Sequence, residues 1–114
     1  MAKTLFTLTG TKHCFGNDIL KAGMKVKLIK EPENEYDHEA IRVEIPELGK
    51  IGYVANSTYT VQGMSLSAGR LYDRIGETAK GKVILVLPNG AICKVSKKSL
   101  VGIDKEMEAF PNEE

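Results

Sequence analysis

The stretch that decides the fold reads Glu31-Pro32-Glu33-Asn34-Glu35-Tyr36-Asp37-His38-Glu39-Ala40-Ile41-Arg42-Val43, and Gly49-Lys50-Ile51-Gly52-Tyr53-Val54 follows it. A dense polar loop runs into an alternating strand, and a second short strand returns with a glycine next to a tyrosine. This order places two aromatic rings, an amide and a carboxylate near one edge of a small β-barrel. Such a set can stack a nucleobase and hydrogen-bond a sugar hydroxyl.

Further strands are predicted on both sides of this stretch, because apolar and polar residues alternate there. We expect strands over residues 4–10, 24–28, 40–45, 50–54, 82–87 and 91–95, a loop over 11–18, and turns at 46–49 and 88–90. The run 82–87 is nearly continuously apolar, which is typical of a buried strand. A short helix is predicted near 65–75, with Ser65 or Ser67 as its cap. The sequence thus indicates a mainly β domain with one short helix.

The bulk composition fits one ordinary globular domain. The chain has 114 residues, an apolar fraction of 42% and a net charge of +1. The low net charge gives no strong global attraction to nucleic acid or membrane, so any polyanion binding must come from local patterning. Two cysteines without CxxC spacing, no leader pattern and no long apolar run predict a reduced, cytoplasmic protein without a cofactor. We expect the barrel domain over 1–100 and a partly frayed C-terminal extension over 101–114.

From about Leu8 to Leu87 the chain resembles the HIRAN domain family. The matching pieces are Gly10 with the loop to Gly16, Gly52-Tyr53-Val54, and the run Glu31-Pro32-x-Asn34-x-Tyr36-Asp37-x-x-Ala40-Ile41-x-Val43. This family occurs at the N-terminus of helicase-like transcription factor remodellers and alone in short bacterial proteins, and the present chain resembles the stand-alone bacterial type. The sequence contains no GxxxxGK[ST] motif, so helicase chemistry does not carry over.

The resemblance implies an oligonucleotide-binding-like (OB-like) or SH3-like barrel of six or seven strands that recognises single-stranded DNA and its free 3′-hydroxyl end. Tyr36 would form one wall of a base-stacking slot, and His13 would form the opposite wall. Asp37 would accept a hydrogen bond from the terminal 3′-hydroxyl, and Asn34 would help to hold the nucleotide.

Three more positions carry over from the family. Tyr53 stands where a polar aromatic side chain contacts the terminal nucleotide, and Lys12 matches a basic residue of the first loop. Asn56 stands where a lysine contacts phosphate. The implied role is a non-enzymatic DNA-binding module that acts in repair or replication, with other proteins of these processes as partners.

The residues support this reading by their own chemistry, and they also allow plainer interpretations. Stacked bases need flat faces and nearby cations, which this chain supplies in its first half as Lys12, Lys25, Lys27, Lys30, Arg42 and Lys50. Asn34 and Asp37 could instead form turns with their own backbone, and Tyr36 could pack on the barrel rim. The alternating lysines could be a solvated strand face, and the loop glutamates Glu31, Glu33, Glu35 and Glu39 repel phosphate.

Other function classes remain open as alternatives. A protein-interaction module could dock a partner through the barrel edge or through a C-terminal segment around Met107 and Phe110. A zinc site would use His13, Cys14, His38 and Cys93, although no paired spacing supports it. A metal-dependent nuclease would use the carboxylates of Glu33, Asp37 and Glu39 with His38. No legible nucleophile–base arrangement is present, so the sequence predicts no catalysis and no bound metal.

Overall fold

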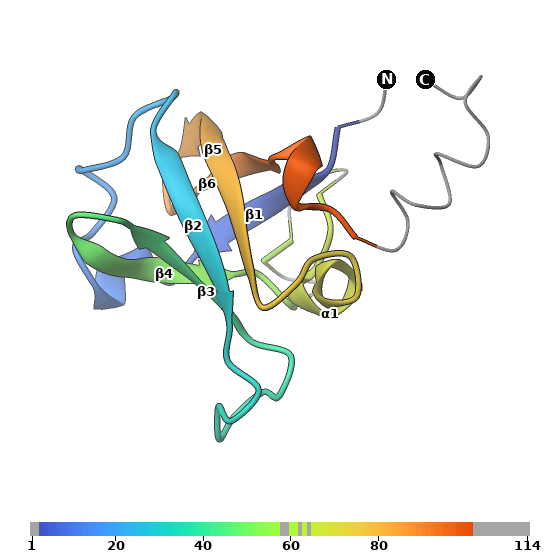
Figure 1. The fold of residues 1–114 in the computed structure, drawn as a ribbon. Helices are drawn as coiled ribbons and strands as arrows, with labels where there is room; N and C mark the ends of the chain where they lie inside the picture. The colour runs from blue at the N-terminus through green and yellow to red at the C-terminus, as the bar shows by residue number, and fades with distance from the viewer. Residues whose placement is uncertain (1–2, 58–59, 62, 64, 102–114) are drawn as a thin grey trace.

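Six antiparallel strands close into a barrel in the computed structural model, which describes residues 3–57, 60–61, 63 and 65–101 apart from the side chain of His13 (Figure 1). The strands follow one another around the barrel in the order β1-β4-β3-β2-β5-β6, and β6 pairs with β1 to close it. Their bounds are β1 (Leu5–Thr9), β2 (Lys25–Lys30), β3 (Ile41–Ile45), β4 (Gly49–Val54), β5 (Thr78–Leu87) and β6 (Gly90–Val95). The predicted mainly β barrel with one short helix is therefore confirmed.

The predicted alternation decides which side chains enter the core. In β2 the side chains of Val26 and Leu28 are buried, whereas Lys25 and Lys27 are exposed. In β3, Ile41 and Val43 are fully buried while Arg42 faces the outside of the barrel. Because side chains of a strand alternate between its faces, one apolar row from each strand is enough to fill a small closed barrel. The core includes Phe6, Leu8, Leu28, Ile41, Val43, Ile51, Leu71, Ile75 and Val83.

Strand β5 differs from the expected buried run. It begins at Thr78, because residues 78–82 pair with β2 before the strand continues along β6. Val83 is buried, but Ile84 and Leu85 are exposed, beside a register shift between Val83 and Leu85. The prediction that residues 82–87 form a buried strand was therefore wrong in part, because a bulge turns Ile84 and Leu85 outward.

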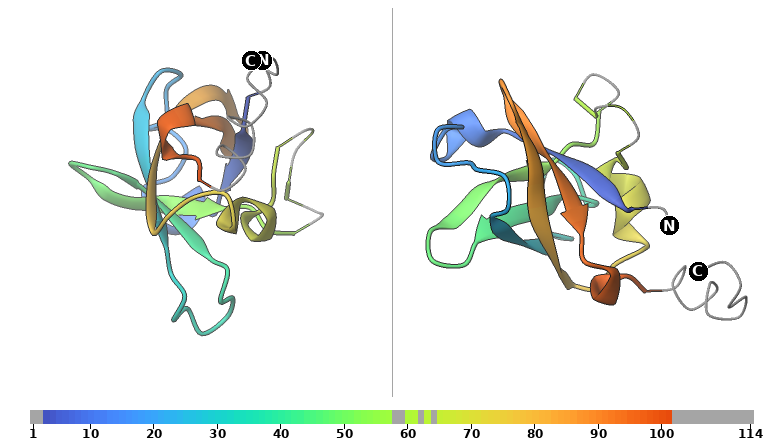
Figure 2. Two further views of the ribbon diagram at one scale, coloured as in Figure 1. Left: turned by 45° about the vertical axis from the view of Figure 1, so that its right-hand side comes forward. Right: turned by 90° about the horizontal axis from the view of Figure 1, so that it is seen from above.

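The helix α1 (Ala68–Tyr72) lies within the predicted range and is shorter than it. Ser67 caps it, since its Oγ accepts a hydrogen bond from the backbone N–H of Arg70 at 3.3 Å. Ala68 and Leu71 are buried against the barrel, and α1 lies beside the end of β4 (Figure 2). Two 3-10 turns, η1 (Thr11–His13) and η2 (Lys97–Ser99), were not predicted. None of the described helices is long and apolar enough to cross a membrane.

Gly52 explains why a glycine precedes the tyrosine of β4. A Cβ atom at this position would meet the backbone oxygen of Thr9 and would lie 2.8 Å from Cδ1 of Leu8. Only a residue without a side chain lets the end of β1 lie so close to β4. In this antiparallel pairing Thr9 is directly opposite Tyr53.

Both cysteines are free. Cys93 is fully buried in the core, and burial raises the pKa of its thiol to about 12. Cys14 is half-buried after η1.

Candidate functional site

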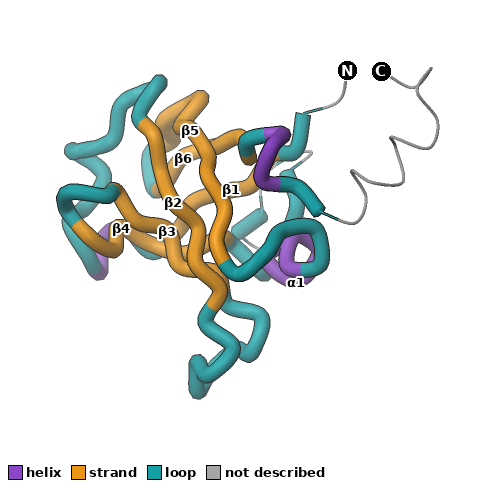
Figure 3. Tube along the Cα trace, in the orientation of Figure 1, coloured by secondary structure: helices purple, strands orange, loops and turns teal. Residues whose placement is uncertain are grey.

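The polar loop 31–40 joins β2 to β3 and extends away from the barrel (Figure 3). Asn34 organises it, because its Oδ1 accepts hydrogen bonds from the backbone N–H groups of Tyr36 at 2.8 Å and Asp37 at 3.0 Å. The backbone N–H of Glu31 donates to the carbonyl of Ala40 at 2.9 Å and closes the loop. Asn34 is therefore a turn-forming residue, as its plainer interpretation proposed.

Glu31 is the hub of this loop. Its Oε1 accepts hydrogen bonds from Nδ2 of Asn34 and from the hydroxyl of Tyr53, both at 3.0 Å, and its Oε2 lies 3.0 Å from Nη1 of Arg42. Burial raises the pKa of Glu31, but these hydrogen bonds and the charge of Arg42 outweigh that effect and hold the pKa below its ordinary value. Part of the negative charge of Glu31 is balanced by Arg42, which also pairs with Glu44.

Asp37 is fixed by two donors from different parts of the chain. Its Oδ1 accepts from the backbone N–H of Glu39 at 2.9 Å, and its Oδ2 accepts from Nδ2 of Asn56 at 2.8 Å. Oδ1 of Asn56 in turn accepts from the backbone N–H of Gly69 in α1 at 2.8 Å. A carboxylate offers about four acceptor positions, so Asp37 keeps acceptor capacity for a further donor.

Tyr36 stands beside this fixed carboxylate and is 90% exposed. The interpretation that Tyr36 packs on the barrel rim was therefore wrong. An exposed tyrosine ring adjacent to an anchored acceptor provides a flat face and a hydrogen-bonding group side by side.

Tyr53 lies on the outer wall of the barrel, and Lys12 lies beyond the end of β1, near Pro88 and Asn89. Tyr53 is opposite Arg42 on one side and opposite Thr9 on the other, and η1 with exposed Lys12 directly follows β1. Nζ of Lys50 lies 5.1 Å from the centroid of the Tyr53 ring. Burial raises the pKa of Tyr53, and so does its hydrogen bond to the negative charge of Glu31, which keeps the phenol protonated as a donor.

Hydrogen bonds between side chains join four of the seven expected site residues, namely Asn34 and Tyr53 through Glu31, and Asp37 with Asn56. Tyr36 neighbours them along the loop, Lys12 lies on η1, and the side chain of His13 lies outside the described part of the chain. Sequence reasoning missed Glu31 and Gly69 as positioning residues. A Cβ on Gly69 would lie 2.7 Å from Oε1 of Glu39 and 3.4 Å from Oδ1 of Asn56, which explains the glycine there.

Two of the cations expected near the site are held by contacts within the protein. Nζ of Lys30 donates to the carbonyl of Ile75 at 2.9 Å and lies 4.2 Å from the centroid of the Tyr72 ring. Arg42 is held between Glu31 and Glu44. Lys25 and Lys27 are exposed on the outer wall of β2 and β5.

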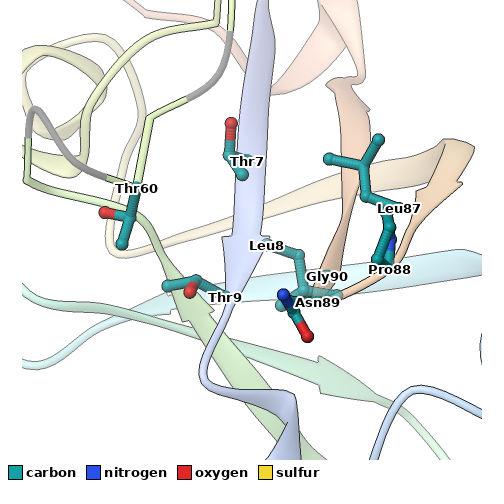
Figure 4. A pocket seen from close by; sticks show the side chains of 8 residues that line it. All are labelled: Thr7, Leu8, Thr9, Thr60, Leu87, Pro88, Asn89 and Gly90. Atoms are coloured by element: carbon teal, nitrogen blue, oxygen red, sulfur yellow. The ribbon is translucent and has the colours of Figure 1, made fainter.

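Two shallow hollows adjoin Thr9. One has a volume of about 310 Å³ and lies between β1, Thr60 and the turn 87–90, with Thr60 and Leu87 on opposite sides of β1 (Figure 4). The second measures about 400 Å³ and includes Lys12. Both share Thr9, Pro88 and Asn89, so they form neighbouring depressions at the end of β1.

Side chains of loop 31–40 that could have bound a metal form hydrogen bonds within the protein. Asp37 bonds Asn56, and Nδ1 of His38 lies 3.0 Å from the carbonyl oxygen of Pro32. In the part of the chain that the structure describes, no group of three or more His, Cys, Asp and Glu side chains is placed to hold a metal ion.

The Glu31 hub gives a pH-dependent prediction. Glu31→Gln is expected to lower the free energy of unfolding at pH 7 by roughly 1 kcal/mol, because a charged acceptor of three donors is replaced by a neutral group. Since the folded-state pKa lies below the ordinary value of 4.5, the stabilisation is present above that value and is lost as the pH falls through the folded-state pKa. The gap between wild type and variant should therefore shrink in acid.

Urea unfolding at neutral pH and at roughly pH 3 measures this gap. Glu33→Gln is the matched control, because it removes an exposed carboxylate from the same loop and is expected to change stability by less than about 0.5 kcal/mol. A gap for Glu31→Gln that does not change with pH would contradict the role of Glu31.

Two solved structures resemble this chain. The chain is similar to the HIRAN domain of human HLTF, with 16% identity and a TM-score of 0.55 over 82% of this chain and 74% of that chain. It is also similar to a protein from Lactobacillus plantarum, with 26% identity and a TM-score of 0.49 over 82% and 92% of the two chains. No curated protein matches.

The family model of the HIRAN domain matches residues 2–82, which include β1 to β4 and the first part of β5 and contain every expected site residue. The match also includes the motif residues from Gly10 to Val54. Membership of this family implies a nucleic-acid-binding module. The chain belongs to the HIRAN domain family.

Proposed function

We propose that loop 31–40 binds the 3′ end of single-stranded DNA, and that this binding serves DNA repair or replication together with other proteins. HIRAN domains are generally binding modules, and the chain is proposed to act without catalysis. The observation that carries the proposal is the ring of Tyr36, 90% exposed, beside the carboxylate of Asp37, which Asn56 and the Glu39 backbone hold in place.

Stacking supplies sequence-independent affinity at this site. A base stacked on an aromatic side chain contributes about 1–3 kcal/mol, and every base has a flat face. Tyr36 packs little of its ring against the protein, so most of both ring faces is available to a base. Lys12, on η1 beyond the end of β1, would contact the phosphate backbone.

Asp37 supplies the preference for an end. A terminal 3′-hydroxyl can donate to the free acceptor positions of its carboxylate, whereas a phosphate at the same place brings negative charge against negative charge. Asn56 and the backbone of Glu39 hold the carboxylate in one orientation, so little conformational entropy is lost when the hydroxyl binds.

Tyr36→Ala is expected to lower the affinity for a single-stranded oligonucleotide by roughly fivefold to 100-fold, the equivalent of one lost stacking contact. Tyr36→Phe keeps the flat face and is expected to bind nearly as wild type. Fluorescence anisotropy with a labelled oligonucleotide at low salt measures both. If Tyr36→Ala binds as tightly as Tyr36→Phe, the stacking role is wrong.

The alternative is a protein-interaction module that docks a partner through the barrel edge or the C-terminal segment. At the barrel edge, β1 and β4 pair only through Leu8 with Val54 and Thr9 with Tyr53. Met107 and Phe110, the other surface, lie outside the described residues. Salt dependence separates the two functions, because DNA binding weakens steadily with salt and an apolar protein contact does not.

A further inference from the structure

Lysines gather on the outer wall of β2, β5 and β6, away from the polar loop. In the sheet register Lys25 is opposite Lys82, Lys82 is opposite Lys94, and Lys27 is opposite Lys80. In Figure 1, β2 and β5 lie side by side at the front of the barrel, and β6 pairs with the other edge of β5. Three adjacent strands therefore present like charges directly to one another.

A groove runs over this wall. It has a volume of about 540 Å³, and six of its ten lining residues are lysines while none is acidic. We call it the lysine groove and define it by Lys25, Lys27, Lys80, Lys82, Lys94 and Lys97. A chain whose net charge is only +1 thus concentrates positive charge on one face.

Five lysines of the groove, Lys25, Lys27, Lys80, Lys82 and Lys94, form no ion pair with a carboxylate in the part of the chain that the structure describes. The ion pairs found among the described residues belong to Arg42 with Glu31 and Glu44. Glu44, which is opposite Lys27 in the register, is the acidic residue nearest to the groove along the sheet, and its carboxylate lies 2.9 Å from Nε of Arg42. Like charges directly opposite in a sheet are destabilising, so an anion that bridges them would relieve repulsion within the free protein.

We propose that the lysine groove binds the phosphodiester backbone of DNA as a second site. Evenly spaced negative charges complement lysines on adjacent strands, which are about 4.8 Å apart, better than a single small anion does. The groove contacts backbone and needs no DNA end, so it goes beyond the end-binding function proposed for loop 31–40. Lysines act here as point charges, which gives affinity without sequence preference.

A covalently closed circular single-stranded DNA tests this site apart from recognition of a 3′ end, because it has none. Lys82→Gln combined with Lys94→Gln is expected to lower the affinity for the circle and to flatten the slope of log K against log salt by about 1.4, or about 0.7 for each lost phosphate contact. Lys3→Gln combined with Lys21→Gln removes the same charge from other exposed positions and is expected to leave the slope nearly unchanged.

Further measurements keep the outcome unambiguous. The groove variant removes like-charge pairs, so its melting temperature is expected to be no lower than that of wild type. A loss of DNA affinity in this variant is then due to the missing lysines and not to unfolding. Tyr36→Ala removes no charge and is expected to leave the salt slope of circle binding nearly unchanged, which separates the groove from stacking on loop 31–40. Binding of the circle by the groove variant as by wild type, or an equal loss in the control variant, would overturn the proposal. The proposal would also be overturned if the groove variant bound DNA as wild type does but bound phosphatidylserine vesicles more weakly, since that result identifies a membrane-binding surface.

Discussion

Replacing Phe6 with alanine is expected to lower the free energy of unfolding by about 3–5 kcal/mol. Phe6 lies in β1, is fully buried and is among the largest side chains of the core. Its backbone pairs with Cys93 of β6 and bridges to Leu66 before α1, so the ring lies where barrel and helix meet. Because small domains are stabilised by only about 5–15 kcal/mol, this loss removes a large share of the total.

In denaturant unfolding, the effect is expected as a lower denaturant concentration at the midpoint, while the dependence of the unfolding free energy on denaturant stays unchanged. Phe15→Ala is the matched control, because it removes the same side chain from the loop after η1, where Phe15 is 49% exposed. We expect this control to change stability by less than about 1 kcal/mol. Similar losses for the two variants would show that Phe6 is not in the core as described.

Replacing Asp37 with alanine is expected to lower the affinity for a 3′-hydroxyl oligonucleotide by about tenfold or more. A hydrogen bond to a charged group contributes about 1.5–3 kcal/mol, which corresponds to this factor. The substitution also removes the contact with Asn56, so the position of the loop is checked separately through thermal unfolding of the variant.

Glu35→Ala is the decisive control for Asp37. It removes one negative charge from the same loop, and the side chain of Glu35 is exposed. If the loop only repels phosphate, both substitutions raise the affinity for DNA. If Asp37 accepts the 3′-hydroxyl, Asp37→Ala binds more weakly while Glu35→Ala does not. An increase in affinity for Asp37→Ala would refute its assigned role.

Most of the barrel could be predicted because its strands carry a local signal. Alternation identifies the buried row of β2 and β3 without knowledge of their neighbours, and Pro88-Asn89-Gly90 marks the turn between β5 and β6. The beginning of β5 could not be predicted in this way. Residues 78–82 become a strand because β2 lies beside them, and Ile84 and Leu85 turn outward at a register shift that leaves no signal in an apolar run.

The candidate site was predictable only in part. The turn formed by Asn34 depends on residues two and three positions away, so its residue type reveals it. The bond from Asn56 to Asp37 spans 19 residues and the bond from Tyr53 to Glu31 spans 22, and both depend on how β3 and β4 pair. Composition alone could not show that Glu31 forms an ion pair with Arg42, so all four glutamates of the loop were expected to repel phosphate.

The most direct test of the proposed function compares two labelled single-stranded oligonucleotides that are identical except for a 3′-hydroxyl or a 3′-phosphate. Fluorescence anisotropy at low salt gives the affinity of the wild-type protein for each. Recognition of the end by Asp37 predicts binding to the hydroxyl form that is tighter by about tenfold or more, since the phosphate loses the hydrogen bond and adds repulsion. Equal affinity for the two ends, or tighter binding to the phosphate, would contradict it.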